Sequence, residues 1–421
     1  MRAPIVLSAA LLWACSDRVP TWHRDVQPIV AQSCTTCHLD GGIAPFALAS
    51  YRDAYDRRAL VHTQVESRLM PPWPPGPGCA EYADDRSLSE QDRGTLLSWL
   101  DHGAPEGNPV DARAVSPPAV AGLSRIDREL QIAGGYTPVE APDEYRCFLL
   151  DWPEPERRFV TGFAAKPGNP AIVHHVLAFL ATPDRAAQFQ ALDDADPAPG
   201  YKCFGGPGGV ANTLGGWAPG NHGGDFPAGT GIPVDPGSKI IIQVHYNLTN
   251  GLGPSDRTSI RLKIDGAVAR PAFLLPWADP SWVNAQTMRI AAGEADVRHA
   301  FVFAPGPYLG LITGNRLSPG KFKVYGAALH QHLRGTHSRL EIQRASGARE
   351  CVLDIPRWDF HWQGGYTLAS PKIVENNDSL SIECHWNNSA GNQPDGLPPR
   401  ELNWGERTQD EMCVGFLYIT Q

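Results

Sequence analysis

Two patterns of apolar and polar positions follow one another along the chain. Up to about residue 110, apolar residues recur at helical spacing, and Ser89 and Gly103 stand where a helix would begin and end. Beyond about residue 120, Gly, Pro and Asn separate short β-branched and aromatic runs, which favours antiparallel sheets. We therefore predict three helices followed by nine strands. The helices span residues 22–32, 50–68 and 89–102, and the strands span residues 158–162, 173–180, 239–246, 259–264, 300–303, 321–329, 338–343, 380–384 and 413–419.

The segment between the two patterns is dense in Pro and Gly, which is typical of an inter-domain linker. The strand-rich part that follows has about 300 residues, which favours two sandwiches over one, although no repeat of fixed period is present. We therefore expect a helical domain, a linker and two β-domains.

Composition and charge exclude one class of partner. The 421 residues include 36 Lys and Arg against 45 Asp and Glu, which gives a net charge of −9 with no basic cluster. The broad electropositive surface of a nucleic-acid-binding protein is therefore missing, and we expect no nucleic-acid partner. No run of about 20 apolar residues is present, so no helix is expected to span a bilayer.

The amino terminus predicts export. Residues 5–14 form an apolar run that is too short to span a membrane and has the length of a signal-peptide core. The run ends in Leu12-Trp13-Ala14-Cys15, which resembles a bacterial lipobox in which the cysteine is acylated. An ordinary signal peptide with a chance cysteine is the alternative. We expect a periplasmic or outer-membrane-anchored lipoprotein whose only membrane contact is a lipid on Cys15.

Two further cysteines form a haem-attachment motif. Cys34-Thr35-Thr36-Cys37-His38 has the spacing that attaches c-type haem, with Cys34 and Cys37 forming thioethers and His38 ligating the iron. The alternative is a structural disulfide beside a surface histidine. Six more cysteines fit up to three disulfides of an exported protein, and they allow 15 connectivities among which sequence does not choose. They are Cys79, Cys147, Cys203, Cys351, Cys384 and Cys413.

Met70 is the expected sixth ligand of the haem iron. It precedes two prolines and Trp73, which stiffen the backbone that presents it, and a thioether ligand raises the reduction potential of haem iron. His23 and His62 are weaker candidates, and the alternative role for Met70 is core packing. The helical segment, with its Met-Pro-Pro-Trp motif, resembles bacterial mono-haem cytochrome domains.

Histidines in the strand-rich part suggest metal sites. His330 and His332 are two apart on an apolar strand, so both rings point to one face and can bind one metal. His174 and His175 are neighbours, and both reach one metal only at a strand end or a bulge, or through different ring nitrogens. His245 ends an apolar strand, where a lone histidine is more often a core residue.

Five short motifs in order give a family resemblance. Residues 173–177, 216–220, 243–246, 329–335 and 411–413 resemble the copper type II, ascorbate-dependent monooxygenases, and the resemblance extends over about residues 140–421. It implies two jelly-roll subdomains with one copper each. By this resemblance His174, His175 and His245 hold an electron-transfer copper, and His330, His332 and Met412 hold the oxygen-activating copper. The family also implies a disulfide between Cys384 and Cys413.

The ligand types agree with this assignment. Three imidazoles suit either oxidation state of copper, whereas two imidazoles and a thioether favour Cu(I). A structural zinc site would have four ligands, usually with cysteine, and non-haem iron prefers two histidines and a carboxylate.

The expected fold class is multi-domain: a small all-α cytochrome c-like domain followed by two all-β antiparallel jelly-roll sandwiches. The expected boundaries are a signal peptide and lipobox at 1–19, the haem domain at 20–110, a linker at 111–135, the three-histidine copper subdomain at 136–268 and the His/His/Met copper subdomain at 269–421.

The expected function is copper-dependent hydroxylation of a C–H bond of a small organic substrate with dioxygen. The expected cofactors are two copper ions and one covalently bound haem c, which would replace or mediate the external reductant. A periplasmic electron donor is an expected partner. Ala328, Val414 and Phe416 stand where the peptide-amidating relative has polar clamping residues, which argues against a peptide substrate.

Two other classes stay open: a non-catalytic haem and copper electron-transfer protein of the periplasm, and a copper-binding module that needs no haem. In another alternative, the haem only docks to a partner oxidase.

Some further residues have no assigned role at this stage. Trp217, Trp358, Trp362 and Tyr366 line a substrate pocket or, more often for aromatic residues in a sandwich, belong to the core. Four histidines near the motifs support the metal ligands or have only structural roles. They are His222, His337, His361 and His385.

Overall fold

The computed structural model describes residues 18–40, 44–83, 85–113, 115, 122–204, 206–218, 221–248, 253, 255–360, 362–394 and 396–421. The predicted signal peptide, Cys15 and His361 lie outside these residues. The chain divides into two compact units. The first comprises Met1–Trp73 and Arg86–Ala119, and the second comprises Pro74–Asp85 and Val120–Gln421.

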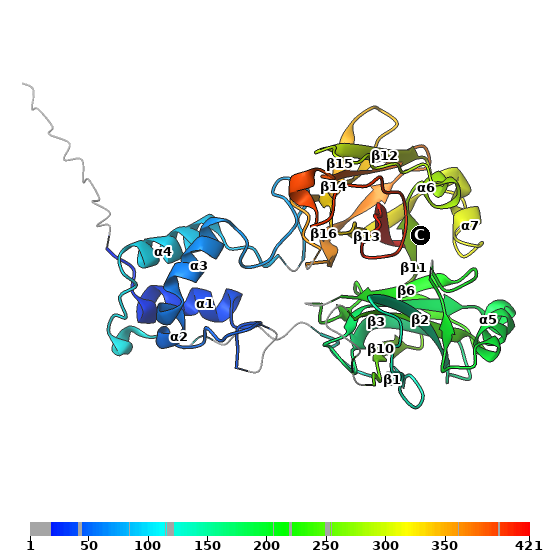
Figure 1. Ribbon diagram of the computed structural model, residues 1–421, viewed down its shortest axis with the longest axis horizontal. Helices are drawn as coiled ribbons and strands as arrows, with labels where there is room; N and C mark the ends of the chain where they lie inside the picture. The colour runs from blue at the N-terminus through cyan, green and yellow to red at the C-terminus, as the bar shows by residue number, and fades with distance from the viewer. Residues whose placement is uncertain are drawn as a thin grey trace, which may run out of the picture. The chain divides into compact units, whose positions relative to one another are not determined.

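Short helices make up the described secondary structure of the first unit (Figure 1). Trp22, from its first helical turn, and Trp99, from its last α-helix, meet in the core with ring centroids 5.8 Å apart. Ser89 caps that last helix by accepting a 3.0 Å hydrogen bond from the backbone N–H of Asp92. The three helical stretches predicted from sequence are confirmed. The elements are the π-helical turn η1 (Trp22–Val26), α1 (Gln27–Ser33), α2 (Tyr51–Asp56), α3 (Arg58–Glu66), α4 (Glu90–Asp101) and the 3₁₀ turn η2 (Pro109–Asp111).

The second unit consists mainly of strands, and all nine predicted strands are present within it. The strands are β1 (Arg128–Gln131), β2 (Asp143–Asp151), β3 (Arg158–Lys166), β4 (Val173–Ala181), β5 (Tyr201–Lys202), β6 (Asn212–Trp217), β7 (Gly224–Asp225), β8 (Thr230–Val234), β9 (Lys239–Asn247), β10 (Ser259–Asp265), β11 (Arg270–Trp277), β12 (Val297–Phe303), β13 (Phe322–His330), β14 (Gly335–Gln343), β15 (Arg349–Ile355), β16 (Gly365–Val374), β17 (Ser379–Trp386) and β18 (Val414–Thr420). The helices are α5 (Pro183–Ala195), α6 (Pro280–Ala285), α7 (Leu309–Ile312), η3 (Gly306–Tyr308) and η4 (Ala390–Asn392).

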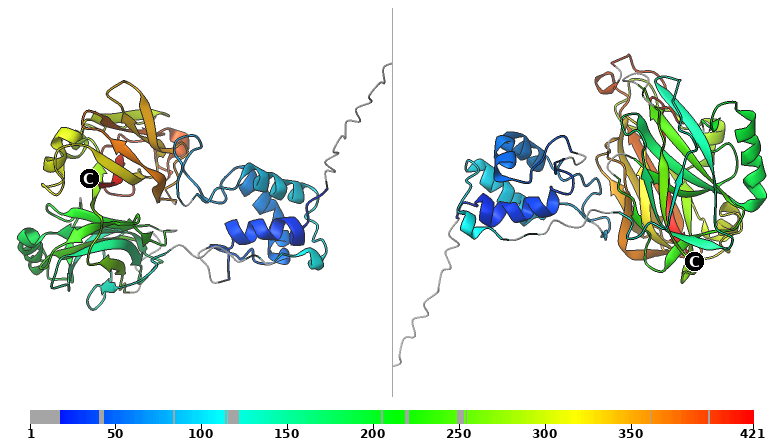
Figure 2. Two further views of the ribbon diagram at one scale, coloured as in Figure 1. Left: turned by 180° about the vertical axis from the view of Figure 1, so that it is seen from behind. Right: turned by 90° about the horizontal axis from the view of Figure 1, so that it is seen from below.

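These strands pair into one large and one small sheet. Ten strands of the 14-stranded sheet follow the order β1-β10-β3-β8-β11-β6-β4-β9-β2-β5, and β18, β13 and β16 continue from β11. The second sheet has the order β12-β17-β14-β15. In Figure 1 the green strands β2, β3, β6 and β10 form one group, and the yellow-to-orange strands β12 to β16 form another. Figure 2 shows the same two groups from behind and from below.

Two central strands position the histidines. The continuous apolar run of β9 is buried from Ile240 to Tyr246, between β2 and β4. In the other group, β13 lies between β16 and β18 and ends at His330. Both strands are buried along most of their length, so the histidines at their ends have firm backbone support.

The expected fold class is wrong. The chain is mostly β-sheet with 19% helix, and no all-α cytochrome-like domain is evident. The first unit has helices of at most 12 residues, and Pro74–Asp85, expected inside the helical domain, belongs to the second unit. Two separate antiparallel jelly rolls are also not seen. β11 pairs with β6 and β8 at one edge and with β18 at the other, so strands of both halves share one sheet, and the β8–β11 pair is parallel.

Three disulfides join the six cysteines that sequence left unpaired. Cys384–Cys413 has the pairing that the family resemblance implied. The other two, Cys79–Cys351 and Cys147–Cys203, had no predicted partners. Among the described residues, no helix is both long and apolar enough to cross a membrane.

Candidate metal centre

Three histidines from two adjacent strands form a cluster in the second unit, which we call the three-histidine set. His174 and His175 lie on β4 and His245 lies on β9, and one ring nitrogen of each lies within 4.8 Å of the other two. The register between β4 and β9 shifts between Val173 and His175. A bulge was one of the arrangements by which two adjacent histidines could reach one metal, and this irregularity at His174 is consistent with it.

The Nδ1 atoms of the three rings face one another. His175 Nδ1 is 3.4 Å from His174 Nδ1 and 3.3 Å from His245 Nδ1. On the other side of its ring, His245 Nε2 is 2.8 Å from Asp143 Oδ1, to which Thr408 donates a hydrogen bond of 3.0 Å. His245 therefore carries its proton on Nε2, and the Nδ1 lone pair is the one available to a metal.

The surroundings keep His175 and His245 neutral. Burial, followed by the charges of the neighbouring histidines, lowers the pKa of His175 well below its usual value. Burial also lowers the pKa of His245, although Asp143 opposes the shift. Burial alone would raise the pKa of Asp143, but its interactions with His245 and Thr408 lower the pKa overall. A neutral imidazole is the form that binds a metal.

Tyr145 forms one wall of the three-histidine set. Its ring stacks on His245 with centroids 4.2 Å apart and an interplanar angle of 8°. Tyr145 lies opposite His245 in the pairing of β2 with β9, and its hydroxyl donates to the carbonyl oxygen of Glu406. The ring of His245 is thus held by a stacked face and by a hydrogen bond at its edge.

His330 and His332 form a second group, the two-histidine set. Their ring centroids are 5.0 Å apart and their planes cross at 78°. His330 Nδ1 donates to Gln363 Oε1 at 2.6 Å, and His332 Nδ1 donates to the carbonyl oxygen of Asp410 at 3.0 Å. In both rings the proton therefore lies on Nδ1 and Nε2 is left for a metal, the reverse of the arrangement at His245.

Burial also keeps the two-histidine set neutral. It lowers the pKa of His330 to about 4, although the hydrogen bond to Gln363 opposes the shift. Burial, followed by the charge of His330, lowers the pKa of His332 well below its usual value. Both rings are therefore in the neutral form near neutral pH, with one proton each, on Nδ1.

A buried carboxylate fixes the backbone around the two-histidine set. Glu411 accepts hydrogen bonds from the backbone N–H groups of His332 and Arg334, at 3.0 and 2.7 Å, and from Trp386 Nε1 at 2.9 Å. Burial raises the pKa of Glu411 to about 7. Gly335 follows in this turn, and a Cβ there would lie 2.8 Å from Trp358 and from Gln331. The turn therefore needs glycine at this position.

Met412 lies in the segment that runs beside this set. It follows Glu411 and precedes β18, in which Val414 pairs with His330. Asp410, two residues before Met412, accepts a hydrogen bond from His332 Nδ1 through its carbonyl oxygen. The backbone of Met412 therefore lies in the short stretch between this contact with His332 and the pairing of Val414 with His330.

Phe360 contacts both sets. Its ring stacks on His174 at 5.1 Å with an interplanar angle of 21°, and it meets His332 edge-on at 6.0 Å and 77°. Phe360 comes from the loop between β15 and β16, which we call the bridging loop and whose described residues are 356–360 and 362–364. The same loop contributes Gln363, and Trp358 Nε1 donates to the carbonyl oxygen of His332 at 3.0 Å. One loop therefore contacts both histidine sets.

The predicted haem ligands lie in the first unit. Cys34, Cys37 and His38 share the turn after α1, in which the His38 N–H donates to the Cys34 carbonyl oxygen at 2.9 Å. Both cysteines are free thiols, whereas the six other described cysteines form disulfides. His38 Nδ1 lies 2.9 Å from the carbonyl oxygen of Phe46, which leaves Nε2 for a metal. Met70, half-buried, follows α3 in the same unit.

The donor sets fit the metals expected of them. The three-histidine set offers three imidazoles, and the two-histidine set offers two beside a thioether-bearing segment. Imidazole suits copper in either oxidation state, and a soft sulfur donor favours Cu(I). In the first unit, two free thiols and a histidine with a committed Nδ1 fit covalent haem attachment.

Comparison with protein families connects the second set to a known chemistry. Residues 313–420 match the family model described as "Copper type II ascorbate-dependent monooxygenase, C-terminal domain". This match supports the copper type II monooxygenase family. It includes His330, His332 and Met412, and it supports a copper-dependent, monooxygenase-like oxidoreductase that uses an organic substrate and dioxygen. The matched region lies wholly in the second unit, so it does not bear on the haem motif.

Two solved structures were also found to be similar. One is a putative secreted protein from Parabacteroides distasonis ATCC 8503, with 10% identity, a TM-score of 0.16, and coverage of 70% of this chain and 87% of that one. The other is the infectious bursal disease virus VP2 subviral particle, with 10% identity, a TM-score of 0.17, and coverage of 72% and 76%. At these TM-scores neither carries an argument about fold or function.

Sequence reasoning missed four residues that shape the site. Asp143, Tyr145, Phe360 and Gln363 all contact the histidines, yet none stands within a recognisable motif. Of the aromatic residues considered for the pocket, Trp358 touches the two-histidine set. The extra histidines His337 and His385 bond to Asp354, Asp296 and Glu383. A useful signal would have been the cluster of Trp358, Phe360 and Trp362 just ahead of a strand.

Proposed function

We propose that this chain is a copper-dependent monooxygenase that hydroxylates a C–H bond of a small organic substrate. His174, His175 and His245 would hold one copper through Nδ1. His330 and His332 through Nε2, with Met412 through its sulfur, would hold a second. Copper bound in this way supplies dioxygen activation and electron transfer.

One observation carries the proposal: two sets of histidines, with different nitrogens available, both contact one phenylalanine. A single closed site would favour a structural metal. Two unlike sets, of which the second lies in the region that matches the monooxygenase family, instead suit a division between electron transfer and oxygen activation.

Side chains beside the two-histidine set favour an apolar substrate. Ala328 lies two residues before His330 on β13, and it pairs with Phe416 on β18, while His330 pairs with Val414. Residues two apart on a strand, together with their cross-strand partners, share one face. The face that carries His330 therefore presents apolar neighbours, which would bind an apolar group by excluding water and offer no clamp for a peptide carboxylate.

We also propose that haem is attached covalently to Cys34 and Cys37, with His38 and Met70 as the iron ligands. The free state of these two thiols supports this, because every other described cysteine is paired. Burial, followed by the proximity of Cys37, raises the pKa of the Cys34 thiol to about 12, which keeps it protonated and protects it from chance disulfide exchange. In this proposal the haem supplies electrons to the copper sites from a periplasmic donor.

We further propose that the protein is exported to the periplasm, with Cys15 as a lipid anchor. Three disulfides support an oxidising compartment.

The main test measures metal content and the origin of oxygen in the product. The full-length chain is produced with export, loaded with copper, reduced, and incubated with isotopically labelled dioxygen and a panel of apolar substrates. We expect two copper ions per chain and one labelled oxygen atom per product. His330→Ala is expected to abolish product. The matched control is His337→Ala, at a histidine that bonds to Asp354 and is assigned to neither copper. Copper uptake without labelled product would favour the non-catalytic alternative.

The haem is tested separately. We expect one haem per chain in the wild-type protein and none in the Cys34→Ala/Cys37→Ala variant. Rapid mixing of the fully reduced protein with dioxygen and substrate should oxidise haem and copper together. A haem that stays reduced while product forms would contradict its role as electron donor.

A further inference from the structure

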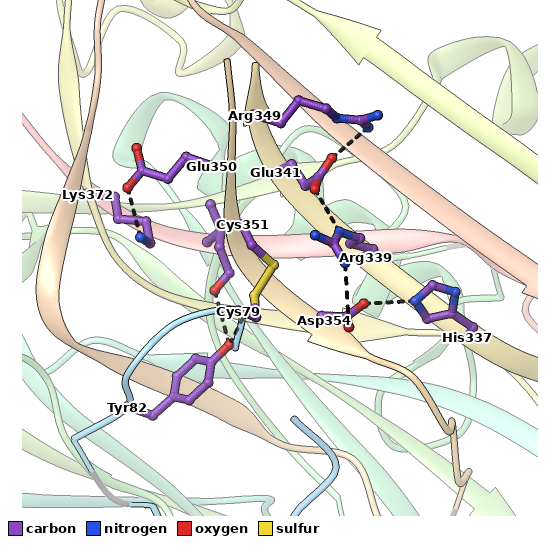
Figure 3. The surroundings of a disulfide bond; sticks show 11 residues. Cys79, Tyr82, His337, Arg339, Glu341, Arg349, Glu350, Cys351, Asp354 and Lys372 are labelled. Atoms are coloured by element: carbon purple, nitrogen blue, oxygen red, sulfur yellow. Dashed lines mark hydrogen bonds and ion pairs between the residues drawn. A yellow bond between two sulfur atoms is a disulfide. The ribbon is translucent and has the colours of Figure 1, made fainter. Parts of the chain in front are cut away.

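A short segment of the second unit packs against the base of the bridging loop. We call the described residues of Pro74–Asp85 the strap. The strap enters from Trp73 and returns to Arg86, both of which belong to the first unit. Cys79 forms a disulfide with Cys351 on β15, and Figure 3 shows Tyr82 beside this bond. The strap is therefore covalently fixed to the strand that leads into the bridging loop.

The strap holds the strands on both sides of the loop. On β15, the N–H of Gly76 donates to the Asp354 carbonyl oxygen at 2.9 Å, and the Tyr82 hydroxyl donates to the Val352 carbonyl oxygen at 3.2 Å. On β16, the N–H of Ala83 donates to the Thr367 carbonyl oxygen at 2.8 Å, and the N–H of Ala369 donates to the Glu81 carbonyl oxygen at 2.9 Å. Tyr82 is only 8% exposed, and its ring lies 5.8 Å from that of Tyr366.

These two strands belong to different sheets. β15 is the last strand of the four-stranded sheet and pairs only with β14, whereas β16 belongs to the 14-stranded sheet and pairs only with β13. Each strand thus has an open edge that needs a hydrogen-bonding partner. By bonding to both edges, the strap joins the two sheets where the bridging loop begins and ends.

The bridging loop has no regular secondary structure among its described residues, yet it holds both histidine sets. Gln363 accepts from His330, and Trp358 bonds to the His332 carbonyl oxygen, while Phe360 stacks on His174. A loop of this kind has many conformations unless its ends are fixed. Gly76 allows close contact at one end, because a Cβ there would lie 3.0 Å from Pro356.

We propose that the strap is a clamp that positions the bridging loop, so that Cys79, Tyr82 and Cys351 act as positioning residues for both histidine sets. The disulfide spans 272 residues of sequence and restricts the separation of segments that the sheets alone leave free. The inference rests on the proposed function only for the identity of the metal. The positioning of the loop is a property of the chain itself.

Hydrogen exchange on the metal-free, full-length protein tests the clamp directly. In Cys79→Ala/Cys351→Ala, backbone amides of residues 356–364 should exchange about tenfold faster or more than in the wild-type protein, because local opening becomes easier. Arg349→Ala is the matched control: Arg349 lies on β15 and pairs with Glu341 rather than with the strap, so exchange in the loop should not change. Unchanged exchange in a folded double variant would overturn the proposal.

A second variant covers the case in which the double variant does not fold. Tyr82→Leu keeps the disulfide and an apolar side chain but loses the hydroxyl bond to Val352 and the ring contact with Tyr366. It should also speed exchange in residues 356–364, by less than the double variant, and wild-type exchange in this variant would overturn the proposal.

Pulsed dipolar electron paramagnetic resonance on the copper(II)-loaded protein then tests the effect on the sites. We expect one narrow distance distribution between the two metals in the wild-type protein and in Arg349→Ala, and a broad one in Cys79→Ala/Cys351→Ala. An equally narrow distribution in the double variant would overturn the clamp. Absence of a second copper in the wild-type protein would overturn the proposed function, while the exchange measurement would still decide the clamp.

Discussion

The two histidine sets differ in what holds their rings. The three-histidine set is built by strand register: a bulge in β4 aligns His174 and His175 with His245, and the charged Asp143 holds His245. In the two-histidine set, His330 ends β13 but His332 lies beyond it, and both rings bond to neutral partners outside the strands, Gln363 and the Asp410 carbonyl. The sheet therefore fixes the first set, while the second depends on segments that tertiary contacts must hold in place. An electron-transfer site benefits from rigidity, and a site that admits substrate benefits from adjustable walls.

Removing one ligand from either set is expected to have the largest effect. His245→Ala and His330→Ala should each bind one copper instead of two and should reduce product to background, because the two sites act in one reaction in the proposed function. X-ray absorption on the reduced variants identifies which copper remains. We expect a copper with a sulfur ligand in His245→Ala and a copper with nitrogen ligands only in His330→Ala. Two coppers in both variants would break the distinction between the sets.

Changing the residues that orient the rings is expected to have a smaller effect. Asp143→Ala should weaken copper binding at the three-histidine set by about 10- to 100-fold, as is usual for such partners of metal-bound histidines. Asp143→Asn, which keeps an acceptor for His245 Nε2 without the charge, is the matched control and should lose less. Copper titration with a competing chelator measures both. Equal losses in the two variants would mean that the charge alone matters.

Replacing the ring of Phe360, which contacts both histidine sets, is expected to lower the turnover rate more than the affinity for copper. Phe360→Ala should bind copper at both sets but turn over about tenfold more slowly, since small displacements of reacting groups are costly. Phe360→Leu keeps an apolar side chain of similar reach and should lose less. Steady-state oxygen uptake, with copper content as the control, checks this. Full activity in Phe360→Ala would show that turnover does not depend on the contact of the Phe360 ring with both histidine sets.

The pH dependence of stability is expected to be the smallest effect. The pKa of His330 is about 4 in the folded protein and about 6.5 when unfolded, so the unfolded chain binds the proton first as pH falls. The metal-free protein should therefore lose about 2 kcal/mol of unfolding free energy between pH 7 and pH 5 from this group alone. Urea unfolding of the wild-type protein and of His330→Gln at both pH values measures the difference. An identical pH dependence in the two would contradict burial of a neutral His330.

The strands that sequence predicted and those that it missed differ in their polar residues. β9 and β13 are mostly apolar and were predicted within one residue or so of their observed bounds. β2 was missed because Glu144 and Arg146 interrupt its apolar pattern. In the structure both are buried and paired, Glu144 with Tyr136 and Arg146 with Asp196. Burial of a paired charge cannot be inferred before the partner is known.

The grouping of the histidines could be predicted from sequence, but their surroundings could not. Residues two apart on a strand and a bulge at adjacent histidines follow from local geometry. The orienting partners lie far away in sequence, 102 residues for Asp143 and His245, and 33 for Gln363 and His330. The fold class failed for a similar reason: local patterns predict strands, but they do not say that β11 joins both halves into one sheet.

Diffraction from copper-loaded crystals at the copper absorption edge tests the central claim most directly. We predict two separate anomalous peaks in the second unit, one between the Nδ1 atoms of His174, His175 and His245, and one between His330 Nε2, His332 Nε2 and the sulfur of Met412. A single peak, or a Met412 sulfur directed away from the second peak, would contradict the account.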